Sequence, residues 1–128
     1  MFNLLLVGSG GFVGSIMRYL IGQGVHALLR NTTFPYGTLT ANILGCLLIG
    51  FFSSFAAERM VFSAQTRLFL FTGLLGGFTT FSTFSLDTFN MIRYHDAQAI
   101  ALGLIHISAH VLIGLAAVYF GYWLARAL

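Results

Sequence analysis

A run of small and polar residues interrupts an apolar segment between Gly73 and Asp87, where the sequence reads GLLGGFTTFSTFSLD. Glycine and β-branched threonine are poor helix formers, and this run contains three glycines and three threonines. Inside a bilayer, backbone that leaves the helix is tolerated only where it is buried in protein or lines a wet cavity. The run therefore predicts a helix break that holds polar groups, and an ion among them, at mid-membrane.

Two phenylalanines lie within this polar run. Phe81 and Phe84 are three residues apart, so they share one face if the helix resumes there. Their neighbours are hydroxyl residues, which is unusual for a pair that faces lipid: Thr80, Ser82, Thr83 and Ser85. Asp87 follows Thr83 by about one helical turn, and we expect it to cap or tether the run. A structural role and a role on an ion path are equally open for this carboxylate.

Asn42 places an amide side chain in the interior of the apolar segment 38–57. It shares one helical stripe with Thr38 and Gly45. It has two possible roles. It either forms an interhelical hydrogen bond, often worth less than about 1 kcal/mol in membranes, or directs an N–H donor into a pore. The residues alone favour neither.

Arg18 is the charged residue inside the first apolar segment. A charge at that depth costs on the order of 2.5–3.5 kcal/mol, so it must face protein or water. It would either hydrogen-bond to broken backbone or attract anions toward a vestibule. Small residues at steps of three and four accompany it and predict a face for close helix packing: Gly8, Gly11, Gly14 and Ser15.

His106 and His110 are spaced i and i+4 in the last apolar segment. Such a pair can bind a metal ion. No acidic residue or cysteine accompanies it, so a polar face directed into the helix bundle is favoured. Cys46 is the single cysteine, which excludes an internal disulfide.

Composition sets the class of protein. Of 128 residues, 58% are hydrophobic and 7% are charged, whereas about a quarter are charged in soluble domains. Four segments are long enough to cross a bilayer, at residues 4–29, 38–57, 68–93 and 97–125. We therefore expect a single all-α integral membrane domain over residues 1–128, with four transmembrane helices in contact with lipid and the third helix broken at mid-membrane. No cleavable signal peptide is expected, and the scattered arginines argue against nucleic-acid binding.

The arginines outside the spans give almost no orientation signal. Three lie on the side of the termini, at Arg59, Arg67 and Arg126, and two lie opposite, at Arg30 and Arg93. The positive-inside rule needs a clear excess. Four short helices are also too few to enclose a polar path. An antiparallel, dual-topology homodimer would satisfy both observations.

Four motifs together resemble the Fluc (CrcB) family of small fluoride channels. They are GGFVGSIMRY at 10–19, GTLTAN at 37–42, GLLGGFTTFSTFS at 73–85 and the polar fourth span. The resemblance implies a fluoride-selective channel in the cell inner membrane, with two pores per antiparallel dimer. It also implies a structural sodium ion (Na+) at the dimer centre, bound by the backbone carbonyls of Gly76 and Thr79 from both subunits.

The resemblance further implies which residues line the fluoride path. By motif, Phe81 and Phe84 match pore-lining phenylalanines and Asn42 matches the pore amide. A polar track would follow these residues: Thr38, Ser82, Thr83, His106 and His110. The sequence departs from the family at His110, where some relatives carry serine, at Gly114, which replaces a hydroxyl residue, and at Asp87, where glutamate is frequent.

The chemistry of fluoride agrees with this donor-rich track. Transfer of a carboxylate-sized ion to low dielectric costs on the order of 20 kcal/mol in an idealised estimate, and each charge-assisted hydrogen bond returns about 1.5–3 kcal/mol. The Asn42 amide, the hydroxyls and histidine N–H groups would supply donors, and phenylalanine rings have a positive edge.

The alternative is a small dual-topology multidrug or cation transporter, but such transporters depend on a first-span carboxylate, and Arg18 stands in that span. A scaffold would not need the polar lining, and no nucleophile–base pair points to an enzyme.

Overall fold

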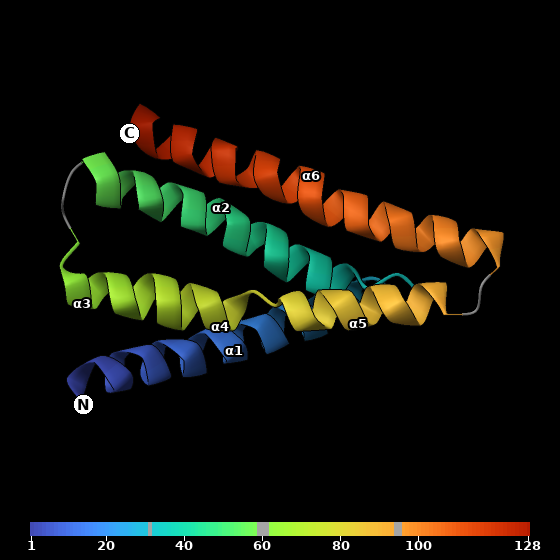
Figure 1. Cartoon of the computed structure of the whole chain (residues 1–128), viewed down its shortest axis with the longest axis horizontal. Coiled ribbons are helices and arrows are strands. Elements are labelled where there is room, and N and C mark those ends of the chain that lie inside the picture. The colour runs from blue at the N-terminus through green and yellow to red at the C-terminus, as the bar shows by residue number, and fades with distance from the viewer. Residues whose placement is uncertain (31, 59–61, 94–95) are drawn as a thin grey trace.

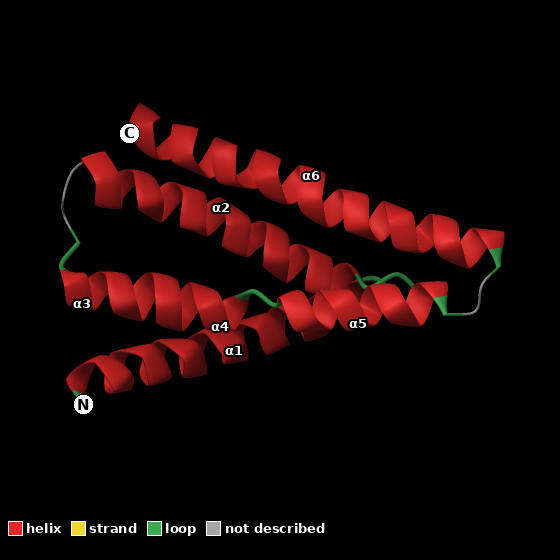
Figure 2. Cartoon of the chain, viewed as in Figure 1, coloured by secondary structure: helices red, strands yellow, loops and turns green. Residues whose placement is uncertain are grey.

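The computed structural model describes residues 1–30, 32–58, 62–93 and 96–128, which form helices and short connectors without any strand among them. Three of the spans are single helices, and the third span is built from four successive segments (Figure 1, Figure 2). In chain order the elements are α1 (Phe2–Leu28), α2 (Tyr36–Glu58), α3 (Ala64–Arg67), η1 (Leu68–Leu75), α4 (Gly76–Phe78), α5 (Phe81–Ile92) and α6 (Ala97–Ala127).

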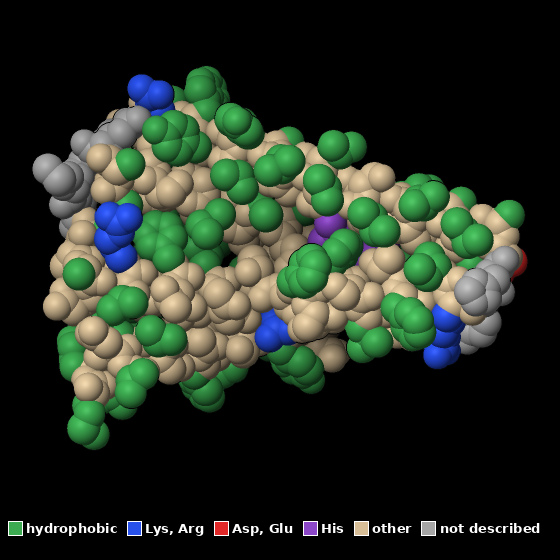
Figure 3. All heavy atoms as spheres, in the orientation of Figure 1, with side chains coloured by type: hydrophobic (Ala, Val, Ile, Leu, Met, Phe, Trp, Pro, Cys, Tyr) green, Lys and Arg blue, Asp and Glu red, His purple; other side chains and the backbone are tan. Residues whose placement is uncertain are grey.

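Four helical rods are long and apolar enough to cross a membrane, which confirms the predicted number of spans. The third runs over Ala64–Ile92 and includes the break. Hydrophobic side chains are spread over the visible surface (Figure 3), and of the large side chains described, Phe78, Leu75 and His106 are the ones fully buried. A surface this apolar is suited to lipid contact rather than to water. The chain is a multi-pass membrane protein.

Both termini lie at the same end of the bundle, as an even number of spans requires (Figure 1). The most extensive packing joins α2 to α6 and α1 to η1. Arg59, one of the arginines counted for orientation, lies outside the described residues.

Glycines bring the packed backbones close together. A Cβ atom on Gly50 would overlap the Val118 carbonyl oxygen, and one on Gly14 would overlap the Leu74 carbonyl oxygen. The predicted small-residue face is present at Gly11 and Gly14, whereas a Cβ added to Gly8 would meet no atom of this copy within 4 Å. Gly10 lies in the contact, because a Cβ added to it would be 2.6 Å from the Phe69 carbonyl oxygen. Gly10 and Gly14 are one turn apart, whereas Gly8 lies far around the helix.

The third rod is broken as predicted, although the break lies at the threonines and not at the glycine pair. Gly76 and Gly77 remain helical in α4. Thr79 (φ −88°, ψ 156°) and Thr80 (φ −148°, ψ 117°) are extended. Gly77 instead serves packing, because its added Cβ would lie 2.6 Å from the Gly11 carbonyl oxygen. The wide π-helical turns of η1 were not predicted.

Candidate ion site at the broken helix

Asn42 of α2 takes over the hydrogen bonds that the break removes from Thr80. Its Nδ2 donates to the Thr80 carbonyl oxygen over 3.1 Å, and its Oδ1 accepts the Thr80 N–H over 2.8 Å. Broken backbone must find such partners because unpaired polar groups are costly in lipid. The interhelical hydrogen bond considered for Asn42 is thus present, and it is directed at backbone.

Arg18 of α1 supports the same break from the other side. Its Nε donates to the Gly77 carbonyl oxygen over 3.2 Å, across 59 residues of sequence. One of the two roles open for this arginine, the hydrogen bond to broken backbone, is thus present.

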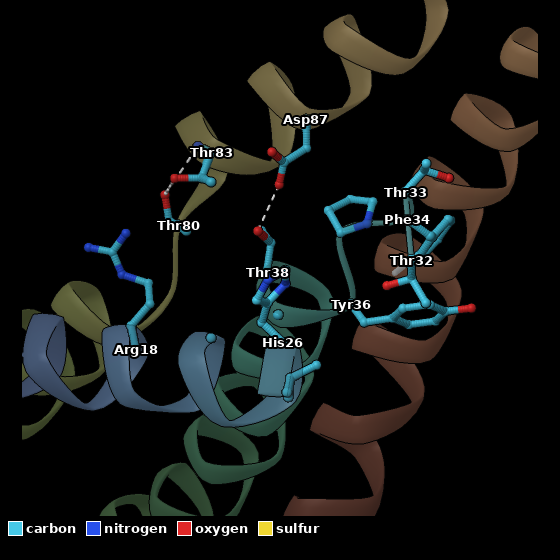
Figure 4. A pocket seen from close by; sticks show the side chains of 14 residues that line it. Arg18, His26, Thr32, Thr33, Phe34, Tyr36, Thr38, Thr80, Thr83 and Asp87 are labelled. Carbon is cyan, nitrogen blue, oxygen red and sulfur yellow. Dashed lines mark hydrogen bonds between the residues drawn. The ribbon is translucent and has the colours of Figure 1, made fainter. Parts of the chain in front are cut away.

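The cap of α5 is Thr80, and Asp87 acts as a tether. Thr80 Oγ1 accepts the Thr83 N–H over 3.2 Å, which is the usual N-cap bond. Asp87 Oδ2 accepts a hydrogen bond from Thr38 Oγ1 over 2.7 Å and so joins α5 to α2 (Figure 4).

Four backbone carbonyl groups lose their helical donors at the break, those of Gly76, Gly77, Phe78 and Thr79. In a continuous helix the Thr80 N–H would bond to Gly76 O and the Thr83 N–H to Thr79 O. Here the first N–H donates to Asn42 and the second to the Thr80 hydroxyl. Gly76 and Thr79, which the family resemblance assigned to sodium, are two of these four residues, and the Gly77 carbonyl oxygen accepts from Arg18 instead.

A polar cavity of about 320 Å³ opens on one side of the break. Figure 4 shows side chains from α1, α2, α5 and the α1–α2 connector around it. Four of the candidate site residues line it: Arg18, Thr38, Thr83 and Asp87.

A second, more apolar cavity of about 390 Å³ also borders the break. Its lining includes six candidate residues: Asn42, Gly76, Thr79, Phe81, Phe84 and His110. Thr80 lines both cavities, so they adjoin at the break. Two candidates line neither cavity, namely Ser82, which is exposed, and His106, which is fully buried.

The aromatic rings form one continuous cluster. The Phe81 and Phe84 ring centroids are 5.5 Å apart, and Phe84 lies 4.5 Å from His110 and 5.3 Å from His106. Phe81 is 80% exposed in this single copy. Phe34, from the α1–α2 connector, packs edge-on against His106 at 5.4 Å.

Sequence reasoning missed three residues of this site. Thr80 caps α5 and holds Asn42, Thr88 bonds to His106, and Phe34 covers the same histidine. The two threonines have a recognisable signal, because hydroxyl residues within an apolar span need partners. Phe34 gave no signal, since its contact depends on how the connector folds back.

Comparison with known proteins agrees with this architecture. The family model described as "CrcB-like protein, Camphor Resistance (CrcB)" matches residues 5–122. The chain belongs to the CrcB family. Three similar CrcB-type relatives, each named "Fluoride-specific ion channel FluC", come from Rhizobium etli, Agrobacterium fabrum and Clostridium perfringens. The first two are 44% identical over 100% of this chain and 99% of their own length. The third is 46% identical over 97% of this chain and 94% of its own.

Proposed function

We propose that this protein is a fluoride-specific channel that lets fluoride cross the cell inner membrane passively. The observation that carries the proposal is the full-length match to relatives named as fluoride-specific channels. Two cavities that meet at a broken helix support it, because polar backbone at membrane depth is characteristic of ion sites. Relatives named as channels give no reason to expect enzyme chemistry.

Donors for the anion would come from both cavities. Asn42 Nδ2 carries a second N–H beside the one that Thr80 accepts. The N-terminal end of α5, which begins at Phe81, adds a positive helix dipole. Phe81 and Phe84 would present ring edges to the ion, and the Thr83 hydroxyl would add a donor in the first cavity. Thr38, whose hydroxyl already donates to Asp87, and the exposed Ser82 would extend the polar track. Many weak donors, without a lysine that would trap the anion, favour passage over tight binding.

The working unit in this proposal is an antiparallel homodimer with two pores. Phe81 is 80% exposed although it lines the second cavity, so a single copy leaves the proposed path open at its side. A second copy against this face would close it. Near-balanced arginines outside the spans permit insertion in both orientations.

A structural sodium ion fits the residues at the break. The carbonyl groups of Gly76 and Thr79 have lost their helical donors, and carbonyl oxygen is a suitable ligand for a hard cation. Gly76 lies in the last helical turn before the break, where the negative end of a helix dipole favours a cation. Two carbonyls from each subunit would place the ion between the copies. The ion would hold the subunits together and make the surrounding potential positive.

Fluoride efflux from liposomes tests the function directly. Purified protein is reconstituted in liposomes loaded with potassium fluoride or potassium chloride, and valinomycin is added to balance charge. We expect rapid fluoride release, recorded with a fluoride electrode, and no chloride release above protein-free liposomes. Equal release of both anions would contradict selectivity. Fluoride release that requires a proton gradient would indicate a coupled transporter instead.

A further inference from the structure

The imidazole of His106, on α6, is held in place from two directions. Its Nδ1 lies 2.9 Å from Thr88 Oγ1, in a hydrogen bond whose direction depends on the histidine tautomer. The Phe34 ring, from the connector that Figure 4 draws beside the first cavity, packs edge-on against it with an interplanar angle of 83°. His106 is also 0% exposed. A side chain with a directional bond, a ring contact and no room around it keeps one orientation.

This fixed imidazole lies against Phe84, a ring proposed to face the fluoride path. The two ring centroids are 5.3 Å apart and the ring planes differ by 31°, so the imidazole lies at a shallow angle to the phenyl ring. Thr88 reaches the same residue from another direction, because its Oγ1 is within hydrogen-bond distance, 2.8 Å, of the Phe84 carbonyl oxygen. His106 and Thr88 together therefore contact Phe84 at its ring and at its backbone.

Packing alone does not account for a histidine at position 106. Its Nε2 is buried and has no hydrogen-bond partner among the described residues. A buried polar atom without a partner opposes folding, so leucine would fill this space at a lower cost. Histidine adds two things that leucine lacks, namely a directional bond to Thr88 and a flat ring that this bond sets against Phe84.

The cavities separate His106 from the proposed path. Phe84 and His110 line the second cavity, whereas His106 lines neither cavity at the break. An ion in the second cavity would therefore meet Phe84 and not His106. The orientation of Phe84 matters to such an ion, because the edge of an aromatic ring is positive and its face is negative.

We propose that His106 is a positioning residue, which holds the Phe84 ring in the orientation that presents its edge to fluoride. Thr88 is its anchor, and the anion does not touch the histidine. This role rests on the proposed function, and it differs from the N–H donor on the path that the family resemblance implied for His106. The residue acts through Phe84, so its loss should first be visible in the motion of that ring.

Fluorine NMR of a single ring tests the positioning without any transport. One meta-fluorophenylalanine is incorporated at position 84 of the full chain, and the protein is purified in detergent. A ring that flips slowly gives two ¹⁹F resonances, one for each orientation, whereas a ring that flips rapidly gives one averaged resonance. We expect two resonances with an otherwise wild-type chain, and we expect them to merge in His106→Leu and in Thr88→Val.

Ser85→Ala is the matched control. The Ser85 hydroxyl donates to the Phe81 carbonyl oxygen over 2.9 Å, in the same kind of bond one turn back along α5, but this bond does not involve His106. We expect the control to keep two resonances. His106→Gln, which also lacks a ring, replaces His106→Leu if the latter does not fold.

Three NMR results would overturn the proposal. They are a single averaged resonance in the wild-type background, two resonances that persist in the folded His106 variant, and merging in Ser85→Ala as well. Persistence of both resonances in Thr88→Val alone would overturn only the role of Thr88 as the anchor.

Fluoride efflux from liposomes then tests whether the ring carries the effect. We expect His106→Leu to slow efflux about tenfold or more in the wild-type background, and to add less than about twofold in the Phe84→Ile background, because independent effects would multiply. A full further loss in that background would mean that His106 acts on fluoride without Phe84, which overturns the positioning role. Unchanged efflux in His106→Leu would overturn the link to transport alone. Absence of efflux from the wild type would instead contradict the proposed function, and the NMR would still decide what holds Phe84.

Discussion

The side-chain amide of Asn42 pairs with both backbone polar groups of Thr80, accepting its N–H over 2.8 Å and donating to its C=O over 3.1 Å. One side chain of α2 thereby replaces two helical hydrogen bonds of the third span. The break is consequently a fixed feature of the fold, held open by a residue 38 positions away.

Asn42→Ala should destabilise the protein because it leaves both Thr80 groups without their partner. Each buried group left unpaired costs about 1–3 kcal/mol. We expect a clearly lower melting temperature in detergent. Ser53→Ala on the same helix is the matched control, since the Ser53 hydroxyl only bonds to Gly50 O within its own turn. Equal melting temperatures for the two variants would show that Asn42 does not hold the break.

Arg18→Lys should be nearly as damaging as Arg18→Gln. Lysine keeps the charge but lacks the planar group whose Nε reaches Gly77 O. A hydrogen bond from a charged group is worth about 1.5–3 kcal/mol, and we expect similar drops in melting temperature for both variants. Arg67→Gln, at an exposed position, is the control. If Arg18→Lys keeps wild-type stability and fluoride efflux while Arg18→Gln does not, the positive charge at position 18 matters and the hydrogen bond to Gly77 O does not.

Gly14→Ala should disrupt the packing of α1 on the third span. Its new Cβ would overlap the Leu74 carbonyl oxygen, whereas the Cβ of Gly8→Ala would meet no atom within 4 Å. Overpacking typically costs about 1–3 kcal/mol, so we expect only Gly14→Ala to lower the melting temperature and the yield of folded protein. Comparable losses at both positions would place Gly8 in a contact that the single copy does not contain.

Phe81→Ile and Phe84→Ile should reduce fluoride efflux more than they reduce dimer recovery. Isoleucine keeps much of the bulk but removes the positive ring edge. We expect a loss of tenfold or more in efflux, equivalent to about 1.4 kcal/mol, with dimer recovery measured by size-exclusion chromatography. Phe89→Ile, on an exposed part of the same helix, is the control. Good dimers with wild-type efflux in both variants would make the rings structural and place the path elsewhere.

Added charge should control the orientation of insertion. Two lysines at the C-terminus should bias one copy, and two lysines beside Arg30 should bias the opposite orientation. We expect little fluoride efflux from either biased protein alone and restored efflux when both are produced together. Full activity from a population shown to have a single orientation would exclude the antiparallel dimer.

The four spans and the broken third helix could be predicted because hydropathy, length and poor helix formers are local properties of the chain. The position of the break could not be placed to the residue. Gly77 stays helical because it packs against Gly11. Thr80 leaves the helix because Asn42 accepts its backbone N–H. Both causes lie in other helices. The histidine pair shows the same limit, since its spacing was visible but the contact of His106 with Thr88 required the fold.

The position of both termini at one end of the bundle limits how two copies could be joined in a single gene (Figure 1). A short peptide between the C-terminus of one copy and the N-terminus of the next would keep both copies in the same orientation. A tandem fusion of opposed copies would need a connecting segment that itself crosses the bilayer, about 20 apolar residues long. The number of spans in such a fusion of opposed copies would thus be odd, with nine where two copies alone contribute eight.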